Sequence, residues 1–126
     1  MYQSYAKVFS DLSDDANQLA ASLDSQALEI NRKKAAYQQA SQAFSSDVNL
    51  FNQRSESGYF NSQYEFSIQR QQLVQRSSWL DGQRQAINQA IDKYNLDKQR
   101  YDGLAAHLSE LNNSVDSGSV DEVPSI

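Results

Sequence analysis

The sequence has no cysteine, one proline, one histidine and four glycines among its 126 residues. The lack of cysteine excludes both a disulfide framework and a thiolate metal site, and it leaves the redox compartment open. Scarce glycine and proline, beside sixteen glutamines and a mean hydropathy of -0.74, argue against a β-rich or a disordered chain. The composition is that of a polar helical protein.

The residues of common catalytic and ligand-binding motifs are missing as well. The lone His107 supplies neither a His-Glu-x-x-His zinc pattern nor a Ser-His-acid triad. No glycine-rich phosphate loop and no calcium loop occurs in the sequence. We therefore expect no enzyme, no metal, no cofactor and no small-molecule substrate.

Charge and hydropathy exclude two further classes. The formal net charge is -5, but residues 1–54 carry five basic and six acidic side chains and residues 62–115 carry six of each, so no concentrated basic face is available for nucleic acid. No run approaches the roughly 20 apolar residues of a membrane-spanning helix, and the N-terminus lacks the features of a signal segment. Such an N-terminus suits a cytoplasmic protein or a domain of a longer chain, so the localisation stays open.

The first 54 residues contain a strict heptad repeat. Apolar residues recur every seven positions, eight times without interruption: Tyr2, Phe9, Ala16, Leu23, Ile30, Tyr37, Phe44 and Phe51. The position three residues further on is apolar at first and mostly polar from Gln26 onward. Because a straight helix drifts about 20° per heptad relative to such a repeat, the pattern predicts a coiled coil.

A break near residues 55–61 separates this repeat from a second one. Gly58 suits the left-handed conformation that ends helices, and Ser62 followed by Glu65 matches a capping box. The second repeat again has eight apolar residues spaced by seven: Phe66, Leu73, Leu80, Ile87, Tyr94, Tyr101, Leu108 and Val115. If the chain reverses near residue 58, each member of one repeat faces a member of the other, and every such pair of residue numbers adds up to 117.

We accordingly predict an all-α protein, a long antiparallel two-helix coiled-coil hairpin at residues 1–116. Helix 1 is expected at about 2–55 and helix 2 at about 62–115, followed by a flexible tail or linker at 117–126. The layers between the apolar ones are mixed or polar, with Asp47 near Arg70 and Lys33 facing Arg84. Because a two-helix hairpin buries little surface, we also expect dimerisation into a four-helix bundle.

Two surfaces are candidates for contact with another protein. The apolar repeats of the two helices form the seam of the hairpin. On helix 2, a stripe away from this seam combines a large aromatic residue with small ones, which permits close helix approach: Ile68, Trp79, Gly82, Ala86 and Ala90. The hairpin tip is a candidate docking surface through its aromatic and charged residues: Arg54, Glu56, Tyr59, Phe60 and Tyr64. The simpler interpretations are a lone surface tryptophan beside indifferent alanines, and aromatic residues that cap the last core layer.

Asparagine repeatedly follows a hydrophobic residue beside the seam. The pairs are Val48-Asn49, Phe51-Asn52, Ile87-Asn88, Tyr94-Asn95 and Leu111-Asn112. With them, residues 30–116 resemble the Asn- and Tyr-rich helical hairpins that precede matrixin-like zinc metalloprotease domains in some bacterial envelope proteins. The resemblance implies an extracytoplasmic hairpin whose catalysis lies in another domain, because the protease signature is missing from this sequence.

Three functions are therefore predicted for testing. The leading one is a non-enzymatic coiled-coil spacer or oligomerisation module. The first alternative is a protein-binding module that docks through the hairpin tip or the Trp79 stripe. The second alternative, implied by the resemblance, is the regulatory arm of a larger metalloprotease. The expected partner is a second copy of the chain or another protein.

Overall fold

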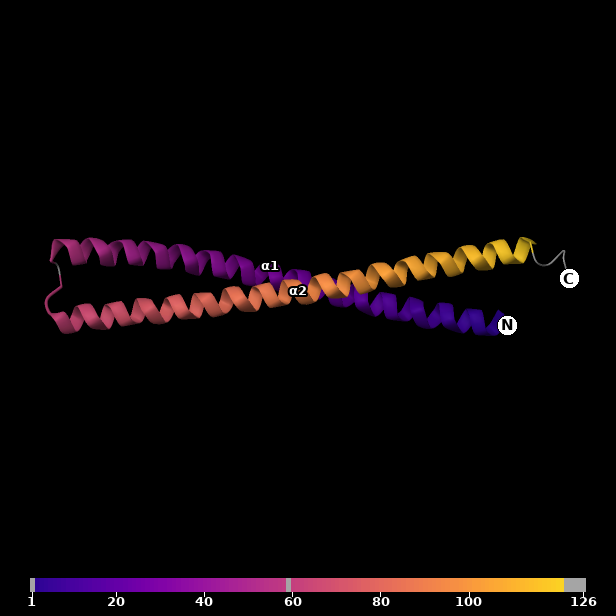
Figure 1. The fold of residues 1–126 in the computed structure, drawn as a ribbon, viewed down its shortest axis with the longest axis horizontal. Coiled ribbons are helices and arrows are strands. Elements are labelled where there is room, and N and C mark those ends of the chain that lie inside the picture. Colours follow the sequence, from indigo (N-terminus) through magenta and orange to yellow (C-terminus); the bar gives the residue numbers. More distant parts are fainter. Residues whose placement is uncertain (1, 59, 122–126) are drawn as a thin grey trace. The chain divides into compact units, whose positions relative to one another are not determined.

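The computed structural model describes the backbone of residues 2–58 and 60–121 and the side chains of residues 5–58 and 60–113. Two helices occupy almost all of it, α1 (Tyr2–Ser57) and α2 (Gln63–Asp121) (Figure 1). They pack against each other, and no strand occurs among these residues, so the predicted all-α helical hairpin is confirmed. Each helix contributes to two compact units: unit 1 (Met1–Ala27 with Asp92–Ile126) and unit 2 (Leu28–Ile91).

Local sequence signals set the inner ends of both helices. Gly58 ends α1 with a φ of 71°, the left-handed conformation that was predicted for it. At the start of α2, the Ser62 Oγ accepts a hydrogen bond from the Glu65 backbone N–H at 3.1 Å. The Glu65 carboxylate in turn accepts from the backbone N–H of Asn61 at 3.2 Å. The capping box is confirmed, and its return bond is made one residue before the cap.

The outer end of α2 lies beyond the expected position near residue 115. The helix continues to Asp121 and so includes residues 117–121, which were expected to form a tail. The physical reason is that a glycine such as Gly118 costs a helix only about 1 kcal/mol relative to alanine, so it does not by itself end the helix. Residues 122–126 lie outside the described part of the chain.

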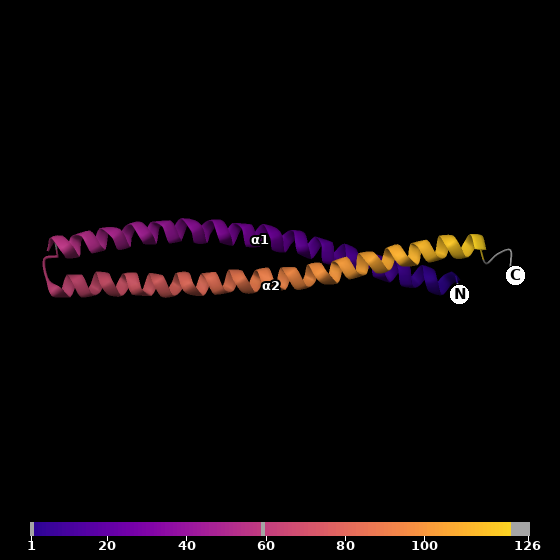
Figure 2. The same cartoon turned by 45° about the horizontal axis from the view of Figure 1, so that its top comes forward.

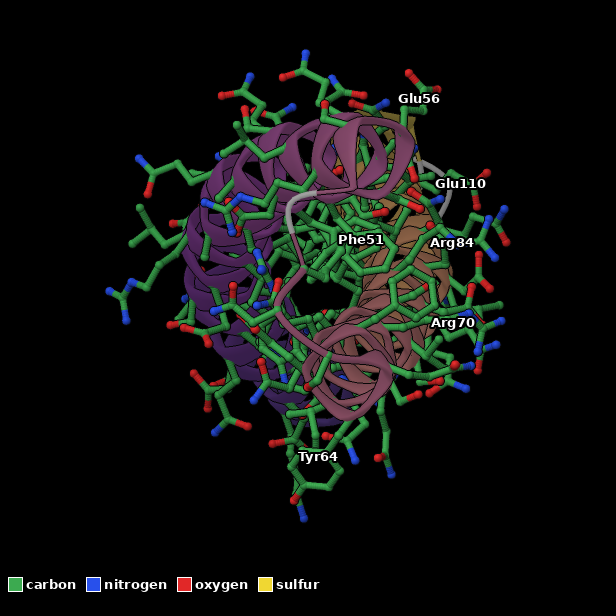
Figure 3. All side chains as sticks on the ribbon, turned by 90° about the vertical axis from the view of Figure 1, so that its left-hand side faces the viewer. Phe51, Glu56, Tyr64, Arg70, Arg84 and Glu110 are labelled. Carbon is green, nitrogen blue, oxygen red and sulfur yellow. The ribbon has the colours of Figure 1, made fainter. Side chains whose placement is uncertain are left out.

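In unit 2 the apolar repeats meet as predicted. Its α1 and α2 segments run side by side from the turn in both views (Figures 1 and 2). Ile30, Leu80 and Ile87 are buried, and the rings of Phe51 and Phe66 stack with their centroids 5.1 Å apart. Figure 3 shows Phe51 directed between the two helices. Pairing of the two apolar repeats is therefore confirmed at the tip.

The polar partners across the seam differ from the prediction. Asp47 pairs with Arg76 at 2.6 Å and not with Arg70, which is exposed and points outward (Figure 3). Arg84 pairs with Asp81 on its own helix at 2.8 Å, and both Arg84 and Lys33 are exposed. The polar partners on α2 were expected one position too far along the chain. Five residues of α2 at the preceding positions are half-buried: Gln69, Arg76, Gln83, Ala90 and Asp97. Of the expected partners, Ile91 is half-buried as well. The reason is that a heptad seam alternates steps of three and four residues, so the seam residue after Phe66 is Gln69.

In unit 1 the core is concentrated away from the chain's outer ends. Ala16, Leu19 and Leu23 are buried. The predicted layer of Phe9 with Leu108 is only partly formed, because Phe9 remains 40% exposed. The outermost predicted pair, Tyr2 with Val115, lies outside the described side chains.

Candidate interaction surfaces

The predicted stripe on α2 is largely exposed, as contact with another chain requires. Ile68, Trp79, Gly82 and Ala86 are all exposed, and Trp79 exposes 56% of its surface. Ala90 differs from the others because it is half-buried, in the same series of seam positions as Gln69, Arg76 and Gln83. The stripe therefore extends from Ile68 to Ala86, beside the seam and entirely within unit 2.

Space is available around the small residues of this stripe. A Cβ atom added to Gly82 would meet nothing within 4 Å. The glycine is therefore not required by packing inside the hairpin, although it costs the helix about 1 kcal/mol relative to alanine. The exposed indole of Trp79 lies one helical turn before it. Together they give the surface one large projection and an adjacent gap.

The stripe belongs to a longer series of uncharged residues, which the search for aromatic and small residues missed. On α2 the series has steps of four and three residues: Ile68, Gln72, Gln75, Trp79, Gly82, Ala86 and Gln89. A matching series on α1 has steps of three and four: Ala36, Gln39, Ala43, Ser46, Leu50 and Gln53. All thirteen residues are exposed. The signal that reveals them is heptad spacing combined with the absence of charge.

A groove shows that the two series lie on the same side of unit 2. Leu50 of the α1 series and Gln72 of the α2 series line one hollow of about 330 Å³, together with the paired Asp47 and Arg76. We call this side, made of the thirteen residues just given, the uncharged face. Three charged residues line the groove. Arg76 and Asp47 form an ion pair across it, and the Arg76 guanidinium also lies 5.5 Å from the ring centroid of Phe44, whereas Arg54 is the remaining cation of the lining.

A second groove in unit 2 has a different character. It encloses about 270 Å³ and is lined by the basic side chains Lys34 and Arg84 together with Ile87, Ile91 and other residues of both helices. Arg84 is partly neutralised by Asp81. None of the thirteen residues of the uncharged face contributes to this lining. We call it the basic groove.

At the tip, one of the predicted docking residues is committed to packing. The ring of Phe60 lies 5.3 Å from those of both Phe51 and Phe66, so the three form a closed aromatic cluster that caps the core of unit 2. Arg54, Glu56 and Tyr64 are exposed. Tyr64 exposes 76% of its surface and points away from the hairpin (Figure 3). Tyr59 lies outside the described residues.

Unit 1 contains a polar network inside its seam. The Gln26 side chain donates from Nε2 to Asp97 Oδ2 at 2.9 Å and to Ser22 Oγ at 3.0 Å. Lys93 Nζ donates to the same Asp97 oxygen at 2.9 Å. These hydrogen bonds, that of Lys93 first and that of Gln26 second, hold the pKa of Asp97 below its ordinary value. The Gln26 Oε1 is buried and accepts no hydrogen bond from the described residues.

Within residues 2–58 and 60–121, no helix has the length and apolarity needed to cross a membrane. The same residues contain no group of three or more histidine or acidic side chains placed to hold a metal ion. Comparison with known proteins gives no match, whether among family models, curated proteins or solved structures. The resemblance to metalloprotease-associated hairpins stays a prediction. The described surface offers shallow grooves and exposed helix faces, which suit contact with another protein.

Proposed function

We propose that this chain is a non-enzymatic oligomerisation module, a helical hairpin that associates with a second copy of itself. The observation that carries the proposal is the balance of hydrophobic burial. Among the described side chains, six hydrophobic residues are buried, none of them completely, whereas ten large hydrophobic residues are exposed. A hairpin that leaves so much apolar surface in water gains free energy by covering it, at about 25 cal/mol for each Å² removed from water.

Self-association supplies that cover without requiring any other molecule. Two hairpins packed side by side place four helices around one core, an arrangement in which each helix buries two faces instead of one. Two-fold contacts between identical chains are also the commonest way in which soluble proteins assemble. The buried residues of a single hairpin would then be only the inner part of the complete core.

The test is the mass of the chain in solution, measured by light scattering together with small-angle X-ray scattering over a range of concentrations. A dimer with twice the mass of the 14.2 kDa chain is expected. Circular dichroism on the same samples would confirm that the helices are present. A folded chain that stays monomeric at every accessible concentration would contradict the proposal.

A second candidate function, capture of a different protein through the tip, is favoured by the exposure of Tyr64. Its ring stands free of the aromatic cluster that holds Phe60, with Arg54 and Glu56 also exposed near the turn. Under this function Tyr64→Ala would abolish partner capture and leave helicity and mass unchanged. Trp79→Glu would leave capture intact. If Trp79→Glu instead lowers the mass to that of the monomer while Tyr64→Ala leaves it unchanged, self-association is favoured.

A further inference from the structure

We propose that the uncharged face of unit 2 is the surface on which a second copy of the chain docks, uncharged face against uncharged face. The inference rests on the proposed function and specifies its contact. It assigns the partner to one side of the hairpin and leaves the tip, the basic groove and unit 1 outside the contact. Four observations support it: spacing, charge, shape and area.

Spacing comes first. Each series of the uncharged face repeats in steps of three and four residues, over residues 36–53 on α1 and 68–89 on α2. This is the spacing by which one helix presents a continuous seam to another. The hairpin already uses a first seam of the same spacing, with Phe44, Phe51, Phe66 and Leu73 among its members. Each helix therefore has a second seam, and no described residue covers either one.

Charge selects a second copy as the occupant. In a two-fold contact each copy presents the same patch, so a charge near the centre meets its own counterpart at short range. Like charges brought together in this way repel, which disfavours self-contact at Lys34 and Arg84 of the basic groove. The thirteen residues of the uncharged face carry no charge at all. In the groove between the two series, Asp47 and Arg76 are already paired, and the third charged residue of the lining, Arg54, lies beyond Gln53, the last residue of the α1 series.

Shape points the same way. Trp79 is the only tryptophan of the chain, and it projects from a face whose other members include Ala36, Ala43, Gly82 and Ala86. Open space surrounds Gly82 in the hairpin. In a two-fold contact the indole of each copy can therefore pack against the small residues of the other copy, where no side chain projects. A large aromatic side chain that fills such a position is the usual anchor of a protein interface.

The area of the face is sufficient for a stable dimer. At about 1.5 Å per residue the two series span about 27 Å and 33 Å, and two adjacent helices of about 10 Å diameter make the face roughly 20 Å wide. Each copy thus contributes about 600 Å², and the pair about 1,200 Å² in total, which is the lower end of the range for stable specific interfaces. A contact on the tip alone would be much smaller.

The experiment combines mass with tryptophan fluorescence in a dilution series. Because Trp79 is the single tryptophan, its emission reports on this face alone. We expect the emission to shift to shorter wavelength as the dimer forms, with the same concentration dependence as the mass. Ala43→Glu, at the centre of the α1 series, should weaken dimerisation by about tenfold or more, because it places two carboxylates in the contact.

The matched control is Ala35→Glu, an identical change at an exposed position of the same helix that is not part of the face. It should change the dimer dissociation constant by less than about twofold. A dimer that forms without a shift in Trp79 emission, or that is weakened equally by both variants, would overturn the assignment of the face and leave the proposed function standing. A chain that never dimerises would overturn both.

Discussion

Unit 1 places Gln26 opposite Asp97 at its polar seam position, whereas unit 2 places Asp47 opposite Arg76 at the corresponding position. In unit 1 a neutral amide meets a carboxylate that Lys93 also contacts, and the Gln26 carbonyl oxygen is left buried without a donor among the described residues. In unit 2 a half-exposed ion pair is formed, and the guanidinium also lies over Phe44.

The difference shows that the same heptad position can hold either a buried hydrogen-bonded pair or a half-exposed ion pair. A polar residue at a seam position costs stability but favours one register, because any slip leaves the polar group without its partner. Unit 1 has the greater burial at this position and therefore the greater penalty for a slip. In unit 2 the ion pair is open to water and contributes about 0–1 kcal/mol. Its register is held instead by the aromatic cluster at the tip and by Leu80 and Ile87.

The largest expected effect compares the two apolar cores. Leu23→Ala in unit 1 and Leu80→Ala in unit 2 should each lower the free energy of unfolding by about 2–5 kcal/mol, because both side chains are buried. Urea unfolding at a fixed protein concentration measures this. The controls are Leu96→Ala in unit 1 and Leu28→Ala in unit 2, which are 66% and 69% exposed and should change it by less than about 0.5 kcal/mol. Equal losses at buried and exposed leucines would contradict this packing.

The next effect concerns the chain reversal, which only unit 2 contains. Gly58→Ala should lower the free energy of unfolding by about 1–2 kcal/mol, because the left-handed conformation at this position crowds a Cβ atom. Gly58→Asn should cost less, since asparagine tolerates that conformation better than alanine. Thermal unfolding of the three proteins gives the order. If alanine proved as stable as glycine, the turn would not depend on this backbone conformation.

Two helical glycines provide a smaller effect of opposite sign. Gly82 in unit 2 and Gly103 in unit 1 both face open space, so Gly82→Ala and Gly103→Ala should each raise the free energy of unfolding by about 1 kcal/mol. The comparison becomes sharper in the Ala43→Glu background, at a protein concentration at which this variant is monomeric and the parent chain is a dimer. The gain at Gly103 should be the same in both backgrounds, whereas the gain at Gly82 should be smaller in the dimer. If the gain at Gly82, like that at Gly103, were the same in both backgrounds, this would argue against a contact at Gly82.

The smallest effect is the pH dependence of the polar network in unit 1. The pKa of Asp97 is lower in the folded chain than in the unfolded chain, so its contribution to stability is present above the unfolded pKa of about 3.9. That contribution is lost as the pH falls through the lower, folded pKa. In Asp97→Asn this part of the acid-induced loss should vanish, and in Lys93→Gln it should shrink. An NMR titration of the Asp97 carboxyl group checks the direction, and an Asp97 pKa at or above its unfolded value would contradict it.

Much of the fold could be predicted because its signals are local or strictly periodic. Gly58, Ser62 and Glu65 act within one turn of chain, and each behaves as its residue type predicts. The prediction was wrong where it needed the rotation of α2 about its own axis. Arg70 and Arg76 are two basic residues of α2, whereas Asp47 belongs to α1, and only the packed arrangement selects Arg76 as the partner of Asp47. The candidate stripe was found through Trp79 and Gly82, but its glutamines and the α1 series were missed, because heptad spacing and the absence of charge mark them and residue size does not.

The sequence by itself determined that the chain forms two helices joined by one tight turn and that Phe51 meets Phe66 beside that turn. These follow from heptad spacing and from capping chemistry, which depend only on neighbours along the chain. The tertiary structure decided which polar side chains pair across the seam and that Phe60 closes the core at the tip. It also decided that series from both helices lie on one uncharged side of unit 2. These features depend on the rotation of one helix against the other, and side-chain packing sets that rotation only once both helices are in contact.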